Sequence, residues 1–91
     1  MLMKWSDLEV GDILKIRDCV AIQGYNDVFV KEFAYKRLKI TKVVSDTVIT
    51  KLSFVGENCR YGSTVHIFSE TGETISNPEW GQLFEIIELR G

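Results

Sequence analysis

The chain has 91 residues, of which 45% are hydrophobic and 26% charged, and its formal net charge is −2 at pH 7. This length suits a single domain over residues 1–91, and the composition is that of a folded protein, which argues against disorder. No apolar run approaches the length of a membrane span, and the N-terminus lacks the apolar stretch of a secretory signal, so we expect a cytoplasmic protein without a membrane partner.

The first predicted elements are a helical turn and a strand. Ser6 can cap a turn over residues 7–9, because its hydroxyl can accept a free backbone N–H and the acidic residues there suit a helix start. Gly11-Asp12 then leads into residues 13–17, where apolar and basic residues alternate as they do in a strand.

Residues 18–36 fit two different structures. Even-numbered Val and Ile residues flank the segment 24–27, whose Gly24 and Asn26 tolerate the positive φ of a tight loop, and this pattern indicates a hairpin. The alternative is a helix that Asn26 caps and that runs to Lys36. The β-branched and aromatic residues at 28–30 favour the hairpin.

The clearest element is a hairpin over residues 37–54, in which β-branched residues alternate with polar ones. Its even-numbered apolar residues are predicted to share the core face: Leu38, Ile40, Val44, Val48, Leu52 and Phe54. A three-residue loop over 45–47 would keep this set together, because it pairs Val44 with Val48, Ile40 with Leu52 and Leu38 with Phe54.

The opposite face of this hairpin is predicted to be basic and exposed to water. It would carry Arg37, Lys39, Thr41 and Lys51, with Val43 and Ile49 as an apolar pair.

The C-terminal part predicts two further elements. After a polar loop over 56–63, a short hairpin would form about residues 70–73. Asn77-Pro78 then breaks the pattern, since proline cannot join an interior ladder, and residues 83–89 read as a closing strand.

These elements predict an all-β domain: a small barrel or curled antiparallel sheet of five to seven short strands, with at most a short N-terminal helical turn. The order of the predicted elements resembles that of the SH3-like small barrels. The resemblance rests on the segment 10–16 with its Gly-Asp opening, the hairpin across 18–36, the strand 38–43 and the terminal stretch 80–88. The chain is similar in particular to the SH3-like proteins that phages and mobile elements encode. The resemblance implies a regulator or inhibitor of a host protein. It does not imply binding of proline-rich peptides, because Trp80 lacks the adjacent tryptophan of such SH3 domains.

The chain lacks the residues of a recognisable catalytic or metal site. His66 is the only histidine, and its place in an alternating strand predicts that it is solvated. Cys19 and Cys59 lie outside any Cys-x-x-Cys pair, whereas a structural zinc needs about four ligands. Each glycine is isolated, so there is no phosphate loop. We therefore expect no enzyme, cofactor or metal, and two reduced thiols.

Charge is unevenly distributed along the chain. Residues 31–43 carry five cations and one anion, a net charge of +4, whereas residues 69–91 carry five anions and one cation, a net charge of −4. This layout favours a non-enzymatic protein-interaction module that uses the face or edge of the 37–54 hairpin. Its predicted binding residues are Arg37, Lys39, Thr41, Val43, Ile49 and Lys51.

Two alternatives remain. Single-stranded nucleic acid could bind where cations interleave with Phe29, Phe33 and Tyr35, the cations holding phosphate and the rings stacking on bases. The site would then comprise Tyr35, Lys36, Arg37, Lys39 and Lys51. The net charge of −2 argues against this alternative, because dedicated nucleic-acid-binding proteins usually carry a positive net charge. The other alternative is a small-ligand-binding barrel with a pocket lined by Tyr25, Tyr61 or Trp80.

Overall fold

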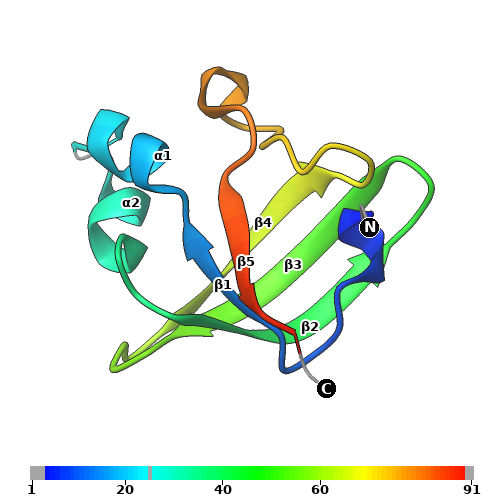
Figure 1. The fold of residues 1–91 in the computed structure, drawn as a ribbon, viewed down its shortest axis with the longest axis horizontal. Coiled ribbons are helices and arrows are strands. Elements are labelled where there is room, and N and C mark those ends of the chain that lie inside the picture. The colour runs from blue at the N-terminus through cyan, green and yellow to red at the C-terminus, as the bar shows by residue number, and fades with distance from the viewer. Residues whose placement is uncertain (1–3, 25, 90–91) are drawn as a thin grey trace.

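The computed structural model describes residues 4–24 and 26–89, and within them five antiparallel strands form one open sheet in the order β4-β3-β2-β1-β5 (Figure 1). The elements in chain order are η1 (Trp5–Asp7), β1 (Ile13–Ile16), α1 (Asp18–Gln23), α2 (Val28–Phe33), β2 (Leu38–Ser45), β3 (Ile49–Gly56), β4 (Gly62–Phe68), η2 (Pro78–Trp80) and β5 (Phe84–Glu88). The predicted mostly β class is confirmed. The first strand, the 37–54 hairpin and the closing strand lie where the sequence places them.

Two short helices replace the hairpin predicted across residues 18–36, so that prediction is wrong, as is the limit of one N-terminal helical turn. The Asp27 carboxylate accepts hydrogen bonds from the backbone N–H groups of Phe29 and Val30, at 2.9 and 3.4 Å, which caps α2. The helical spacing also brings the Phe29 and Phe33 rings together, with centroids 5.2 Å apart. Capping and ring burial thus override the strand propensity of residues 28–30. The alternative helix is correct in kind, but Asp27 rather than Asn26 caps it and it ends at Phe33.

At the N-terminus a single 3-10 turn covers residues 5–7, so Ser6 lies inside the turn instead of capping it. The turn places Trp5 against the core with only 6% of its surface exposed. The Trp5 backbone N–H donates to the Ser69 carbonyl at 2.8 Å, which joins the N-terminal segment to the end of β4.

The predicted register of the 37–54 hairpin is wrong. Ser45 pairs with Thr50, so the connection spans 46–49, and Ile40 pairs with Phe54. The Asp46 carboxylate accepts from the backbone N–H groups of Val48 and Ile49, at 2.9 and 2.8 Å, and these bonds stabilise the longer loop.

An irregularity between Ile40 and Lys42 also changes which side chains of β2 face the core. Beyond it Val43 pairs with Leu52 and is half-buried against the core, whereas Val44 is 51% exposed. The expectations that Val44 and Val48 are core residues and that Val43 lies on the wet face are therefore wrong. The rest of the predicted core set, Leu38, Ile40, Leu52 and Phe54, is buried as expected.

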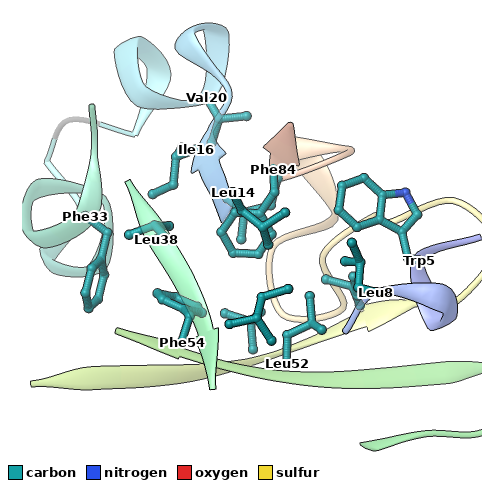
Figure 2. Packing of buried hydrophobic residues seen from close by; sticks show 14 of the residues in the cluster. Trp5, Leu8, Leu14, Ile16, Val20, Phe33, Leu38, Leu52, Phe54 and Phe84 are labelled. Atoms are coloured by element: carbon teal, nitrogen blue, oxygen red, sulfur yellow. The ribbon is translucent and has the colours of Figure 1, made fainter. Parts of the chain in front are cut away.

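The core lies between the strands β2 and β3 on one side and β1 and β5 on the other. Figure 2 shows Leu52 and Phe54 pointing toward Leu14 and Phe84. Helices α1 and α2 close one end of this space, and the N-terminal segment lies toward the other (Figure 1). Among the described elements, no helix covers the opposite face of β2, β3 and β4 (Figure 1).

A first test of the packing concerns Gly72, whose φ is +76° and whose added Cβ would overlap the indole ring of Trp5. We expect Gly72→Ala to lower the free energy of unfolding by about 2–4 kcal/mol, because it combines a left-handed backbone with overpacking. Gly81→Ala tests backbone strain without overpacking, since Gly81 has φ +64° and ψ −132° but no atom within 4 Å of an added Cβ. Urea unfolding followed by circular dichroism measures both; an unchanged stability of Gly72→Ala would contradict the close contact with Trp5.

A second test concerns the Asp46 carboxylate. Its hydrogen bonds from the backbone N–H of Ile49, and then of Val48, lower the pKa of Asp46 below its ordinary value of 3.8. Since the folded-state pKa is depressed, the stabilisation is complete above the ordinary pKa and is lost as the pH falls through the lower one. In Asp46→Asn the amide oxygen can accept the same bonds but does not titrate. Between about pH 5 and about pH 2, urea midpoints of the wild type should fall relative to this variant; parallel profiles would show that Asp46 contributes nothing to the loop.

Candidate functional site

The strand register defines a solvent-exposed face of β2, β3 and β4, which we call the outer face. Odd-numbered side chains of β3 and even-numbered side chains of β4 point to it, because those strands alternate with buried residues. Residues paired directly across neighbouring strands have their side chains on the same face of the sheet. The outer face comprises Lys39, Lys42, Val44, Ile49, Lys51, Ser53, Val55, Thr64, His66 and Phe68.

The outer face is basic. Strands β2, β3 and β4 contain no acidic residue, while Lys39, Lys42 and Lys51 are all exposed. None of these three lysines forms an ion pair with a described residue; the ion pairs of the described chain involve Lys4, Lys15 and Arg37. A chain with a net charge of −2 thus presents a face on which the fixed charges are positive.

The strand register arranges these lysines around hydroxyl groups. Lys42 lies opposite Ser53, whose hydroxyl is hydrogen-bonded to that of Thr64 at 3.0 Å. Lys51 lies between Val44 on β2 and His66 on β4. His66 is exposed, as its alternation predicts. The centre of the face is therefore polar and carries donors for acidic groups.

One end of the outer face is apolar. Ile49 and Phe68 are direct cross-strand partners, 37% and 41% exposed, and Val44 and Val48 beside the loop are 51% and 58% exposed. Val48 and Phe68 also line a hollow of about 300 Å³, together with Thr47, Glu70, Thr71 and Glu73. A patch of mixed apolar and charged character is typical of a modest protein interface.

Some residues predicted to bind a partner come together on this face and others do not. Lys39, Lys51 and Ile49 lie on it, and Thr41 is exposed at the irregularity of β2. Arg37 lies beside Lys39 at a hollow of about 280 Å³, where its guanidinium is 2.7 Å from the Glu88 carboxylate. The predicted Val43–Ile49 patch does not exist, since Val43 points toward the core. Both strands of the hairpin pair with other strands as well, which directs binding to the face and not to a hairpin edge.

The aromatic strip expected for nucleic acid is not formed. Phe33 is buried and Phe29 half-buried, and both rings contact Phe54. Tyr35 is 67% exposed, but Lys36 is half-buried and directs its ammonium toward the Cys59 sulfur, 3.3 Å away.

Sequence reasoning missed Lys42, Thr64, His66 and Phe68 as members of the face. For the three residues of β4 a signal existed, because their alternation with Val65 and Ile67 fixes their side once β4 is paired with β3. No comparable signal existed for Lys42, whose side depends on the irregularity in β2.

A separate cavity of about 270 Å³ lies beside Trp80. Its lining comprises Asp27, Phe29, Thr64, Val65, His66, Thr74, Ser76, Asn77, Trp80 and Leu83. Of the residues predicted for a small-ligand pocket, Trp80 lines it, Tyr61 is 69% exposed elsewhere, and Tyr25 lies outside the described residues.

Within the described ranges no group of three or more His, Cys, Asp or Glu side chains could hold a metal ion, and no helix is long and apolar enough to cross a membrane. Cys19 is exposed, Cys59 is half-buried, and both are free thiols.

Comparison with known proteins adds no relative: no protein-family model matches the chain, and no curated protein or solved structure matches it significantly. The resemblance to SH3-like barrels stays a prediction.

Proposed function

We propose that this protein is a non-enzymatic interaction module whose outer face binds an acidic surface of another protein. The observation that carries the proposal is the acid-free face with three exposed lysines that no described carboxylate neutralises. Positive charge that is left free on a rigid sheet is available to a partner, where it gives specificity and speeds association.

Two features favour a protein partner over nucleic acid. The lysines adjoin exposed aliphatic and aromatic side chains at Val44, Val48, Ile49 and Phe68, which suit the apolar part of a protein interface. Of the three rings expected to stack on bases, Phe29 and Phe33 pack on Phe54 and only Tyr35 is exposed. The net charge of −2 also opposes general attraction to a polyanion.

Such a module would act by covering or tethering its partner. The resemblance to phage and mobile-element proteins supports a role as a regulator or inhibitor of a host protein. Two free thiols, one of them exposed, suit a reducing cytoplasm.

Affinity capture with the immobilised protein, from lysate with and without nuclease, tests this proposal. We expect a captured protein that persists after nuclease treatment, elutes at about 0.5 M salt because exposed charges are screened, and is lost with Lys42→Glu/Lys51→Glu. Capture that disappears with nuclease, or that the variant retains in full, would contradict a protein partner on the outer face.

A further inference from the structure

The cavity beside Trp80 is built from three separate parts of the chain: the start of α2, the edge of β4, and residues 74–83, which include η2. Hydrogen bonds hold the segment 74–77 in place, from Thr74 N to Gly81 O and from Ile75 N to His66 O, both at 3.1 Å. The Trp80 ring reaches the α1–α2 connection, since its Cζ2 lies 3.6 Å from an ideal Cβ on Gly24. The walls are therefore fixed by the fold.

The formal charge of the described lining residues is negative at pH 7. Asp27 is the only acidic residue among the described lining residues, and no lysine or arginine lines the cavity. The Asp27 Oδ1 atom caps α2, which fixes the position of the carboxylate at the cavity. Lys51 lies opposite His66 on the neighbouring strand β3 and is not among the described lining residues.

Apart from Val65, Leu83 and the imidazole of His66, the remaining lining residues supply acceptor oxygens and aromatic rings. The oxygens belong to Thr64, Thr74, Ser76 and Asn77, and the rings to Phe29 and Trp80. A carboxylate, neutral acceptors and ring faces together are the groups that bind an organic cation, through charge-assisted hydrogen bonds and cation–π contact.

Thr74 adds an independent observation. Thr74 is one of the lining residues and is 4% exposed, and its buried Oγ1 has no hydrogen-bond partner among the described residues. A buried hydroxyl left without a partner is unfavourable, and native structures keep few of them. A ligand that donates hydrogen bonds at this wall would satisfy it.

We propose that this cavity binds the guanidinium or ammonium group of an organic cation. The positive group would lie between the Asp27 carboxylate and the rings of Phe29 and Trp80, and it would donate to the hydroxyl of Thr74. The cation is either a small diffusible amine or guanidine, or the Arg or Lys side chain of a peptide. This site uses none of the outer-face lysines, and although Thr64 and His66 belong to both the outer face and the cavity lining, either proposal can fail without the other.

Titration of the ¹⁵N-labelled full chain with N-butylguanidinium tests the proposal, with isosteric, uncharged N-butylurea as the matched ligand. The Trp80 indole N–H signal is the reporter, and the Trp5 signal is an internal control because Trp5 is buried against Gly72. We expect a saturable shift of the Trp80 signal alone, with affinity for butylurea at least about tenfold lower, since a charged hydrogen bond and a cation–π contact are lost.

Two variants separate binding from folding. Asp27→Asn keeps a good helix cap and should weaken butylguanidinium binding by about tenfold, and Thr74→Val should weaken it by about fivefold because one hydrogen bond is lost. Lys42→Glu/Lys51→Glu should bind it at least as well as the wild type. Equal affinity for the urea, unchanged affinity in Asp27→Asn, or no saturable shift at millimolar concentrations would overturn the proposal.

The peptide acetyl-Gly-Arg-Gly-amide distinguishes the two sources of the cation. Tighter binding than that of butylguanidinium would identify an arginine side chain of a partner as the ligand. Exclusion of the peptide, with butylguanidinium still bound, would identify a diffusible cation.

Discussion

Replacing Lys42 and Lys51 together with glutamate should lower affinity for the captured partner by about a hundredfold, because each reversal removes an attraction and adds a like-charge repulsion of the order of 1–2 kcal/mol. Both side chains are exposed on the central part of the outer face, and neither forms an ion pair with a described residue. Stability should therefore change little. Binding is measured by surface plasmon resonance against the purified partner, and folding by circular dichroism.

The matched control is Lys4→Glu with Lys31→Glu, which changes the net charge equally but lies off the outer face. Lys4 is an exposed partner of Glu70, and Lys31 is exposed on α2. We expect the control to bind within about threefold of the wild type, since only long-range screened charge is altered. Equal losses in both pairs would show that the partner responds to net charge, and unfolding of the Lys42/Lys51 variant would show that these side chains do not face solvent.

Phe54→Ala should be the most destabilising core change, lowering the free energy of unfolding by about 3–5 kcal/mol. The Phe54 ring contacts those of Phe29, Phe33 and Phe84, with centroids 6.0, 5.1 and 5.5 Å apart. The total free energy of unfolding of a natural domain is about 5–15 kcal/mol, so the variant should be close to unfolding. Urea unfolding measures the loss.

Two comparisons make this result specific to the ring cluster. Tyr61→Ala removes a ring that is 69% exposed and should cost less than about 0.5 kcal/mol. A double-mutant cycle of Phe54→Ala with Phe33→Ala should give a coupling energy of about 0.5–1.5 kcal/mol, since the rings meet edge to face. Absence of coupling would contradict the helical placement of Phe33.

Local pattern was sufficient for the strands but not for the helices. Alternation placed Leu38, Ile40, Leu52 and Phe54 in the core, because a strand buried on one face leaves period two in the sequence. The segment 28–33 has strand propensity, yet the Asp27 cap and the packing of two rings on Phe54 make it a helix. That outcome combines a local signal, the Asp27 cap, with a tertiary contact on Phe54 that no local pattern contains.

The candidate surfaces were predictable to different degrees. Lys39 and Lys51 could be placed on the outer face by parity alone. Lys42 could not, because one irregularity in β2 reverses the parity beyond Ile40. The cavity beside Trp80 was beyond sequence reasoning except for Trp80 itself, since its walls come from three separate parts of the chain.

The claim that the outer face binds acidic polypeptide is tested most directly by titrating the ¹⁵N-labelled protein with a hexaglutamate peptide. Backbone amide shifts should concentrate at Lys42, Lys51 and Thr64, and should vanish in Lys42→Glu/Lys51→Glu but persist in Lys4→Glu/Lys31→Glu. Shifts confined to α1 and α2, or shifts that the outer-face variant retains, would contradict it.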